Sequence, residues 1–407
     1  MKILFLNNYF YIRGGSERVF FGEMDLMRNH GHEIAEFARR HSLDMPSKYS
    51  HFFPQDIVTD KISISWDAVR TVKEIFYSVS ARDGLDKLIS QFKPAIAHVH
   101  NMYGRLTTSV LDVLSQRRIP TLMTLHDYKV VCPSYRFMFE NHICEDCKGA
   151  RYYMAVKNHC HKNSFAASAM VAMESYFNEW FNRYKKNVRY FISPSRFLEN
   201  KLIEFGWPER QIKFVPNFLD LSEFDPNYSA GDYLLYLGRL SEEKGVATLI
   251  KAFTQLKNDK PELVIVGDGP MRKELEEITR NHSRIRFAGY LSGSALREVT
   301  QNALAVVVPS VCYENAPISI LEALAYGKPV IGANIGGIPE MIQNGVNGYL
   351  FESGNCNDLK NALEYMINLP AAEIEKMGMD ARRIVERENS SESHYLKLMD
   401  IYQEIQA

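Results

Sequence analysis

Two glutamates that lie eight positions apart late in the chain are the residues best placed for chemistry. An apolar strand is predicted over residues 304–308, ahead of Glu314, and a helical pattern that contains Glu322 runs from Pro317 to Gly327. Open parallel sheets bind ligands at such strand-to-helix loops, and the free N–H groups of a helix start favour phosphate. The pattern therefore indicates a site for a phosphate joined to a polyhydroxylated group, as in a nucleotide-sugar. A single glutamate here would suit an ordinary surface helix, but the pair in this setting favours a site.

Two cations follow the predicted strand 233–237. Arg239 and Lys244 are five positions apart, one on the turn and the other at the start of the next helix. Arginine offers a planar fork and lysine a point charge, so both can converge on a diphosphate. There they could stabilise a leaving group, as a metal ion does elsewhere. Two solvated surface cations remain the alternative interpretation.

Paired glycines and a histidine follow strands of the first half. Gly14 and Gly15 would let backbone N–H groups approach a phosphate closely, although the three-glycine dinucleotide fingerprint is missing and a plain turn is equally compatible. His126 follows the predicted strand 121–125, where a neutral imidazole can hydrogen-bond a sugar hydroxyl or carbonyl; a structural role is the alternative. His100 has a similar place and a weaker claim.

The six cysteines fall into a group of four and two isolated residues. The four have the ligand count of a tetrahedral zinc site, although their outer spacings exceed those of common zinc fingers, and buried or free thiols are the alternative. The group is Cys132, Cys144, Cys147 and Cys160, and the isolated residues are Cys312 and Cys356. We expect all six to be reduced thiols in the cytoplasm.

Composition and patterning predict two α/β domains. The chain has 407 residues, of which 46% are hydrophobic and 24% charged, a globular balance. Both halves alternate short apolar strands with helical patterns, which is typical of parallel sheets. The predicted strands are 3–6, 33–37, 95–99, 121–125 and 190–192, followed by 233–237, 263–266, 285–288, 304–308 and 330–332.

We expect two Rossmann-like domains that face each other across a cleft. Prolines and asparagines cluster at 215–228 and mark the switch between them. The predicted boundaries are 1–215 for the first domain and 216–390 for the second. The tail 391–407 is helical in pattern and is expected to pack back on the first domain.

The net charge of −1 conceals an asymmetry between the halves. Residues 1–200 carry 27 basic and 20 acidic side chains (+7), and residues 201–407 carry 21 and 29 (−8). A basic first half suits an anionic membrane surface or a phosphorylated acceptor, although the halves could equally attract each other. We expect no nucleic-acid partner, since no recognised motif or strongly basic domain is present. The N-terminal apolar run is too short for a secretory signal and no stretch is long enough to span a membrane, so a cytoplasmic location is expected.

An aromatic stretch precedes a cluster of basic residues. One helical stripe is formed by Phe177, Trp180, Phe181 and Tyr184, and the basic cluster is Arg183, Lys185, Lys186 and Arg189. The stripe is interpreted first as core. The basic end suits contact with a membrane interface, on the inner face of the plasma membrane.

Taken together, the motifs resemble glycosyltransferase family 4, retaining enzymes of GT-B fold. The second-half motifs, in order, are Arg239…Lys244-Gly245, Val266-Gly-Asp-Gly-Pro270, Phe287-Ala-Gly-Tyr290, the Glu314/Glu322 pair and Gly336-Gly-Ile-Pro-Glu340. The looser first-half motifs are Gly14-Gly15, His126-Asp127 and Ser193-Pro-Ser195. The resemblance covers nearly the whole chain.

The resemblance implies a role for each candidate residue. Glu314 would hold hydroxyls of the donor sugar, Glu322 the ribose hydroxyls, and Arg239 with Lys244 would neutralise the diphosphate. His126 would lie against the sugar near the reacting carbon. Further donor-binding positions are Gly14, Gly15, Gly238, Gly267, Asn315, Ala316, Pro317 and Ile318, with Phe287 and Tyr290 in the segment that lines the base.

The resemblance also implies a reaction. A sugar would move with retention from a nucleotide-sugar to an acceptor hydroxyl, without a catalytic metal or other cofactor, in the assembly of bacterial polysaccharide, O-antigen or capsule. The acceptor would be a glycan or a lipid-linked glycan bound by the first domain, 1–215, and the second domain, 216–390, would bind the nucleotide-sugar. The alternatives are another GT-B enzyme, such as a sugar-nucleotide epimerase or a phosphorylase, or a non-catalytic nucleotide-sugar-binding protein. A Rossmann oxidoreductase is disfavoured because the three-glycine fingerprint is missing.

Overall fold

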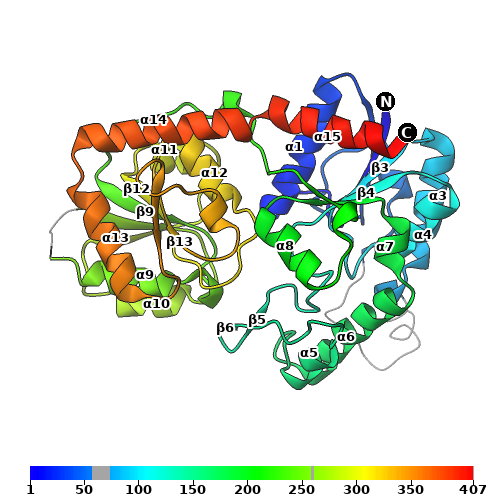
Figure 1. The fold of residues 1–407 in the computed structure, drawn as a ribbon, viewed down its shortest axis with the longest axis horizontal. Helices are drawn as coiled ribbons and strands as arrows, with labels where there is room; N and C mark the ends of the chain where they lie inside the picture. The colour runs from blue at the N-terminus through cyan, green and yellow to red at the C-terminus, as the bar shows by residue number, and fades with distance from the viewer. Residues whose placement is uncertain (57–73, 258–260, 407) are drawn as a thin grey trace. The chain divides into compact units, whose positions relative to one another are not determined.

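The chain folds into two compact units in the computed structural model (Figure 1). The structure describes residues 1–56, 74–257 and 261–406. Unit 1 comprises Met1–Arg136, Glu145–Val215 and Tyr395–Ala407, and unit 2 comprises Phe137–Cys144 and Pro216–His394. Each unit is built around its own six-stranded sheet.

The sheet of unit 1 is parallel throughout, in the order β2-β1-β3-β4-β7-β8. Its strands are β1 Lys2–Leu6, β2 Glu33–Phe37, β3 Ile96–Val99, β4 Thr121–Thr124, β7 Tyr190–Ser193 and β8 Ile212–Phe214. β3, β4 and β7 are buried along their whole length, as expected where helices cover both faces of a parallel sheet. After β1 the chain forms β2 on one side of it and then β3 on the other side, which creates a topological switch point between β1 and β3.

Helices connect these strands, and several begin at a serine that caps them. The Ser78 side chain accepts a hydrogen bond from the Ala81 N–H at the start of α3, and the Ser195 side chain accepts one from the Leu198 N–H at the start of α8. The Ser193-Pro-Ser195 motif therefore contains a helix cap. The helices are α1 Gly15–Asn29, α3 Val79–Phe92, α4 Ser109–Gln116, α5 Tyr153–Lys157, α6 Phe165–Trp180, α7 Arg183–Asn187, α8 Arg196–Glu204 and α15 Ser391–Gln406. From Tyr395 onward α15 belongs to unit 1.

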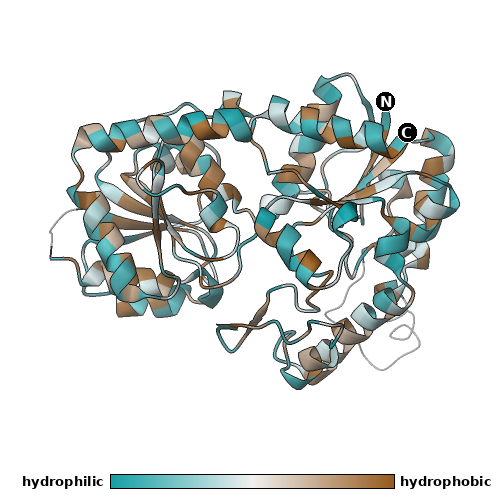
Figure 2. Cartoon of the chain, viewed as in Figure 1, coloured by the Kyte–Doolittle hydropathy of each residue, from teal (hydrophilic) through white to brown (hydrophobic). Residues whose placement is uncertain are grey.

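Unit 2 repeats this plan in the order β11-β10-β9-β12-β13-β14, again with parallel pairs. Its strands are β9 Tyr233–Leu237, β10 Glu262–Val266, β11 Ile285–Gly289, β12 Ala305–Val308, β13 Val330–Ala333 and β14 Gly348–Phe351. Its helices are α9 Val246–Thr254, α10 Arg272–Ile278, α11 Gly293–Gln301, α12 Ile318–Ala325, α13 Cys356–Asn368 and α14 Ala371–Glu388. The sheet is hydrophobic and the surrounding helices carry hydrophilic faces (Figure 2). The switch point of this sheet lies between β9 and β12.

Every predicted strand coincides with an observed one, and the structure adds four. Two are the edge strands β8 and β14, which are too short to show a pattern. The others are β5 Met138–Phe139 and β6 His142–Ile143, a hairpin with positive φ at both Glu140 and Asn141, as a two-residue turn of mirror-image type requires. This hairpin groups with unit 2, whereas the sequence placed all of 1–215 in the first domain.

The core interpretation of the aromatic stripe is wrong for two of its members. Trp180 is 76% exposed and Phe181 52% exposed. Instead, α6 buries polar side chains: Glu174 pairs with Lys129 (Oε2–Nζ 2.9 Å), and Asn178 accepts a hydrogen bond from Thr108. Burial of these paired polar groups turns the aromatic face of the helix outward. Among the described helices none is long and apolar enough to cross a membrane.

Candidate functional site

Lys244 and Glu314 form an ion pair at the switch point of unit 2. Lys244 ends a short 3-10 turn, Glu242–Lys244, that follows β9, and Glu314 lies on the loop between β12 and α12. The Lys244 Nζ is 2.6 Å from Oε1 of Glu314, and the Ser310 hydroxyl donates to the same oxygen over 2.6 Å. The structure thus brings together two residues that the sequence assigned to separate groups of one ligand.

The electrostatics of the pair keep both groups charged. Burial alone would raise the pKa of Glu314, but the Lys244 ammonium and the hydrogen bonds from Lys244 and Ser310 lower it below its ordinary value. Burial alone would lower the pKa of Lys244, but the Glu314 carboxylate raises it. Nearby, burial and then the Glu314 charge raise the pKa of Cys312 to about 12, so this residue is a thiol and not a nucleophilic thiolate.

Close backbone packing fixes the loops that carry the pair. Gly245 has φ +68°, and a Cβ there would lie 1.9 Å from the carbonyl oxygen of Pro309. Gly336 has φ +61°, and its Cβ would lie 2.4 Å from the carbonyl oxygen of Glu314, which accepts a bond from the Gly337 N–H over 2.7 Å. Only glycine allows both approaches. The glycines of two motifs therefore hold Lys244 and Glu314 in register.

Gly238 and Gly267 allow the loops after β9 and β10 to pack closely against each other. A Cβ on Gly267 would lie 1.8 Å from the Gly238 carbonyl oxygen. The Gly238 N–H donates to Val266 and the Gly267 N–H to Gly289, over 3.1 and 2.7 Å. These two N–H groups are thus used inside the protein and are not available as donors to a ligand.

Arg239 differs from Lys244 in its surroundings. Its side chain is exposed and makes no hydrogen bond or ion pair with any residue in the described ranges, while its carbonyl accepts a bond from the Tyr236 hydroxyl over 2.8 Å. Burial and then the Glu314 charge raise the pKa of Tyr236, which keeps that hydroxyl protonated. The loop is therefore anchored at its backbone and presents an exposed cation.

The start of α12 supplies the remaining donor-binding candidates. Asn315 is buried, the Ala316 carbonyl accepts a bond from Asn217 over 3.0 Å, and Pro317 is the extended N-cap that precedes Ile318. Glu322 lies on the second turn of this helix and is partly buried. At the edge of the same sheet, Phe287 is partly buried in the middle of β11, and Tyr290, just beyond the strand, is 75% exposed.

The hairpin Phe137–Cys144 contacts both loops of the ion pair. The Phe137 ring meets the Tyr313 ring edge-on at 5.9 Å, next to Glu314. The Asn141 side-chain amide donates to the carboxylate of Glu242, which lies two residues before Lys244. Sequence reasoning missed this element because four strand residues carry no periodicity.

In unit 1 the predicted glycines begin a helix. Gly14 is the N-cap of α1 with an extended φ of −170°, and Gly15 is the first helical residue. A fifteen-residue helix offers its free N–H groups at this point. The glycines therefore occupy the predicted strand-to-helix position, at the switch point of the unit 1 sheet.

His126 lies after β4 in contact with a second histidine. Its ring stacks on His100 with centroids 5.1 Å apart, and its Nε2 is 2.8 Å from the Nδ1 of His100. Burial, and then the neighbouring His100, lower the pKa of His126 to about 3. The imidazole is therefore neutral at physiological pH. His100, given the weaker claim from the sequence, is the direct partner of His126.

Two family models match the chain and together extend over most of it. The model of "Glycosyltransferase Family 4" matches residues 13–223, about half of the chain, and the model of "Glycosyl transferases group 1" matches residues 222–384. The chain belongs to glycosyltransferase family 4. Its two Rossmann-like units are those of a GT-B fold, and the Lys244–Glu314 pair falls within the second matched region.

Individual relatives match this family 4 protein over parts of their length. It is 33% identical over 177 residues to the uncharacterized glycosyltransferase MJ1607 of Methanocaldococcus jannaschii, which covers 39% of this chain and 45% of the relative. It is 26% identical over 227 residues to the amylovoran biosynthesis glycosyltransferase AmsK of Erwinia amylovora, with coverages of 52% and 55%. The chain thus spans about half the length of these relatives. A crystal structure of Anabaena Alr3699/HepE in complex with UDP shares the fold, with a TM-score of 0.66, 17% identity and coverages of 99% and 100%.

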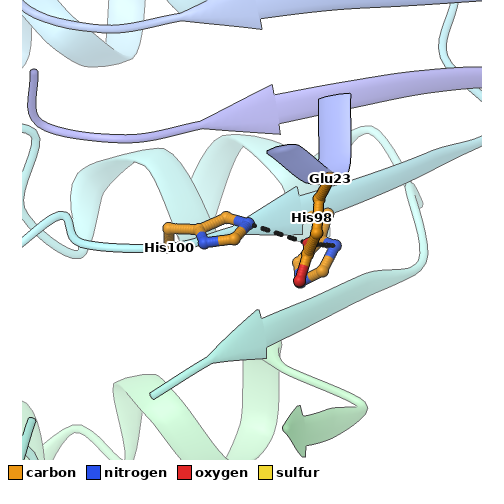
Figure 3. A group of neighbouring side chains, drawn as sticks. All are labelled: Glu23, His98 and His100. Atoms are coloured by element: carbon orange, nitrogen blue, oxygen red, sulfur yellow. Dashed lines mark ion pairs between the residues drawn. The ribbon is translucent and has the colours of Figure 1, made fainter. Parts of the chain in front are cut away.

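Sequence reasoning missed one buried cluster in the family 4 protein. In the described part of the chain, a single group of three metal-ligand-type side chains has its ligand atoms within 4.8 Å of one another: Glu23, His98 and His100 (Figure 3). His98 and His100 stand two positions apart at the end of β3 and thus on one face of the sheet, a signal that could have found them. Nothing in the sequence pointed to Glu23 on α1.

The predicted cysteine site has a different outcome. None of Cys132, Cys144, Cys147 and Cys160 takes part in a group of that kind, and all four are thiols. Cys132 and Cys147 are buried, and Cys144 and Cys160 are partly buried. Zinc binding by this quartet stays a prediction.

Proposed function

We propose that this family 4 glycosyltransferase moves a sugar with retention from a nucleotide-sugar to an acceptor hydroxyl. The observation that carries the proposal is the charged Lys244–Glu314 pair, fixed at the switch point of the unit 2 sheet beside the start of α12. A cation, a carboxylate and free helix N–H groups at one sheet edge match a ligand that joins phosphates to a sugar.

The pair gives each residue a role that depends on the other. An ammonium group has three N–H donors, so Lys244 can hold Glu314 and reach a donor phosphate as well. The exposed Arg239 adds a second cation to the departing diphosphate. Glu314, kept ionised by Lys244, accepts hydrogen bonds from sugar hydroxyls, and Glu322 takes those of the ribose. Phosphate charge that grows in the transition state is then met by cations already in place.

The proposed transfer balances without a further reactant. The bond between the sugar C1 and the phosphate oxygen breaks as the acceptor oxygen bonds to C1 on the same face. The acceptor's proton passes to the departing phosphate oxygen. The neutral His126 contributes a hydrogen bond to the sugar. No residue is required to become covalently linked, and added metal is expected to be unnecessary.

The relatives suggest which donor and pathway to examine first. The structural relative from Anabaena was crystallised with UDP, so UDP-linked sugars are the first donors to test. AmsK carries amylovoran biosynthesis in its name, and we propose a corresponding place for this chain in bacterial surface polysaccharide assembly, acting on a glycan or lipid-linked glycan. A sugar-nucleotide epimerase, a phosphorylase and a non-catalytic binding protein are the rival proposals.

A lipid-linked acceptor is supported by the outward aromatic face of α6. Phe165 and Trp180 are 65% and 76% exposed at the two ends of this helix, and Met173 is 53% exposed between them. Such a face next to cations suits peripheral binding at an anionic membrane. Of the four predicted cations, Lys186 and Arg189 are exposed. Arg183 and Lys185 pair with Asp112 and Glu179, which reduces the electrostatic contribution predicted from the sequence. We propose the cytoplasmic face of the plasma membrane as the setting.

The experiment combines a donor panel with matched lysine variants. Purified protein is supplied with each nucleotide-sugar, with and without a glycan acceptor, and nucleoside diphosphate release is measured. One donor should be consumed only with acceptor, and Lys244→Ala should remove this release while Lys251→Ala, an exposed position on α9, should not. Conversion of a donor without acceptor and without diphosphate release would instead indicate an epimerase, and binding without any turnover a silent protein.

A further inference from the structure

Three side chains of the types that bind metals meet in the core of unit 1. Glu23 extends from α1, while His98 lies on β3 and His100 just after it (Figure 3). Oε2 of Glu23 is 3.3 Å from His98 Nδ1 and 3.3 Å from His100 Nε2. All three side chains are at most 1% exposed. Two imidazoles and one carboxylate are an established ligand set for zinc in proteins.

The contact between Glu23 and His100 is not a hydrogen bond. His100 Nε2 is buried and has no hydrogen-bond partner among the described residues. Buried polar atoms in native proteins are almost always satisfied, and an exception calls for an explanation such as a bound ion. An imidazole nitrogen with unused bonding capacity thus lies beside a carboxylate oxygen, away from solvent.

The distances in this cluster fit the edges of a tetrahedron around zinc. Zinc bonds to nitrogen and oxygen of about 2.0–2.1 Å place two tetrahedral ligands about 3.3–3.4 Å apart. Both carboxylate-to-imidazole separations are 3.3 Å, and the two ring nitrogens lie within 4.8 Å of each other. Along such an edge each lone pair points at the metal and not at the other ligand. A close contact without a hydrogen bond is therefore what a zinc site requires.

The outer nitrogens of both imidazoles have the partners that zinc ligands need. An imidazole that binds metal through one nitrogen donates the proton on its other nitrogen to a fixed acceptor. His98 Nε2 lies 2.7 Å from the Thr124 hydroxyl. His100 Nδ1 lies 2.8 Å from Nε2 of His126. A hydroxyl oxygen and a neutral imidazole nitrogen can both accept this proton, so His98 Nδ1 and His100 Nε2 can turn their lone pairs to a metal.

A tyrosine supplies a fourth oxygen at the same point. The Tyr402 hydroxyl, on α15, is 2.8 Å from His98 Nδ1, and the residue is fully buried. Structural zinc sites have four protein ligands. Zinc with one carboxylate and two neutral imidazoles carries a net charge of +1, which Tyr402 would cancel if it bound as a phenolate and released its proton. Metal binding would exchange the present hydrogen bond for a bond from each of these two atoms to zinc.

We propose that Glu23, His98 and His100 bind a structural zinc ion in unit 1, with the Tyr402 hydroxyl as the fourth ligand. Zinc is favoured over magnesium and calcium because those ions prefer oxygen ligands, whereas imidazole suits zinc. The ligands come from α1, β3 and α15, so the ion would tie both ends of the chain to one strand of the sheet. No step of the proposed sugar transfer uses this ion.

X-ray absorption at the zinc edge tests the proposal on the wild-type protein. The full chain is produced with added zinc, purified without a histidine tag and dialysed against a weak chelator. Elemental analysis should find zinc, and the nearest shell should contain nitrogen and oxygen at about 2.0–2.1 Å, with scattering from imidazole. A sulfur shell at about 2.3 Å alone would assign the metal to the predicted cysteine site and overturn the proposal. So would the absence of zinc, which would indicate a doubly protonated His100 beside an ionised Glu23.

Two variants assign the ligands. Glu23→Gln and His98→Gln should each lose one equivalent of zinc relative to the wild type, and any zinc on the cysteines should remain. Glu36→Gln alters a buried carboxyl on β2 that pairs with Arg28, and this matched control should keep the full zinc content. Full zinc content in folded Glu23→Gln and His98→Gln would overturn the proposal. If neither variant folds, the absorption spectrum of the wild type still decides.

The structural role is measured by thermal unfolding. Removal of zinc by a strong chelator should lower the melting temperature of the wild type by roughly 5–10 °C, the effect of a ligand present at about 100 times its dissociation constant. Glu23→Gln should respond less. An unchanged melting temperature after verified loss of zinc would contradict a structural role. None of these measurements uses sugar transfer, so a failure of the proposed function would leave their outcome intact.

Discussion

The two units each bury a carboxylate near a sheet switch point, but they surround it differently. Glu314 in unit 2 is paired with an ammonium and a hydroxyl, whereas Glu23 in unit 1 faces two imidazoles. The first arrangement keeps two opposite full charges within reach of a ligand. In unit 1, burial and then His100 lower the pKa of His126 to about 3 and keep it neutral, against the opposing charge of Glu23. Under the proposed function, the charged pair would serve the phosphates and the neutral imidazole the hydroxyl groups.

Loss of a charge in unit 2 should reduce turnover the most, so removal of Glu314 is the strongest test of the difference between the two units. Glu314→Ala should reduce turnover at least about 100-fold, because the sugar loses a charge-assisted hydrogen bond of about 1.5–3 kcal/mol and Lys244 loses its partner. Steady-state kinetics should show the loss in kcat, whereas Glu322→Ala should mainly raise KM for the donor. Near-normal turnover in Glu314→Ala, with an unchanged melting temperature, would contradict the role of the pair.

Removal of either cation, Lys244 or Arg239, should have the next largest effect on turnover. Lys244→Ala and Arg239→Ala should each lower turnover by about 100-fold, since leaving-group charge builds up in the transition state. Lys244→Ala should also raise the pKa of Glu314, because burial then acts without the ammonium that opposes it. Activity in this variant should accordingly fall further as the pH is lowered. A strict need for added Mg²⁺ or Mn²⁺ in the wild type would count against cations as the main stabilisers.

A zinc ion bound by the cysteine quartet would add a metal charge to the first half of the chain, where the comparison above has a neutral imidazole. If Cys132, Cys144, Cys147 and Cys160 bind zinc, purified protein should contain about one equivalent, and chelation should lower the melting temperature. Elemental analysis measures the metal, thiol titration the accessible cysteines, and thermal unfolding with and without chelator the effect on stability. The absence of metal, together with four titratable thiols, would contradict zinc binding by this segment.

Asp127, next to His126, offers a smaller effect with a defined pH dependence. Burial raises the pKa of Asp127 to about 6, although its bond from the Lys129 N–H and the Lys129 charge lower it. The resulting stability is complete below the ordinary pKa near 3.8 and is lost as the pH rises through 6. Asp127→Asn should therefore stabilise the protein above pH 6 by at most about 3 kcal/mol, and have little effect at pH 4.

Denaturant unfolding at several pH values measures this difference. The exposed Asp83→Asn on α3 is the control and should show no comparable trend. A destabilised Asp127→Asn at pH 8 would show that the carboxylate is favourably held, and that charge matters in unit 1 as well.

The sequence revealed the unit 2 site because its parts are local. Lys244 and Glu314 each lie within a few residues of a strand end and a glycine that marks a turn, so both could be placed at one sheet edge. Their direct contact was not predictable, since it depends on Gly245 and Gly336 allowing the loops to approach. Ten strands were visible as apolar runs, but two edge strands and the hairpin were too short.

The buried cluster of Glu23, His98 and His100 in unit 1 comes from segments that are far apart in the sequence. Glu23 and Tyr402 are nearly 380 positions apart and meet at the imidazole of His98, which no local pattern can show. Likewise the outward face of α6 depends on Lys129 and Thr108 binding its polar residues. Aromatic spacing alone favoured a core helix, because it carries no information about which partner the polar side would find.

Binding of nucleoside diphosphate to Lys244→Ala tests the central claim most directly. Calorimetric titration would compare UDP, or the diphosphate of whichever base binds, with the matching nucleoside in the wild type, Lys244→Ala and Lys251→Ala. The account predicts that Lys244→Ala weakens diphosphate binding about tenfold or more, while nucleoside affinity and the Lys251→Ala control stay unchanged. Equal diphosphate affinity in the wild type and Lys244→Ala would contradict the assignment of the Lys244–Glu314 pair as the phosphate end of the donor site.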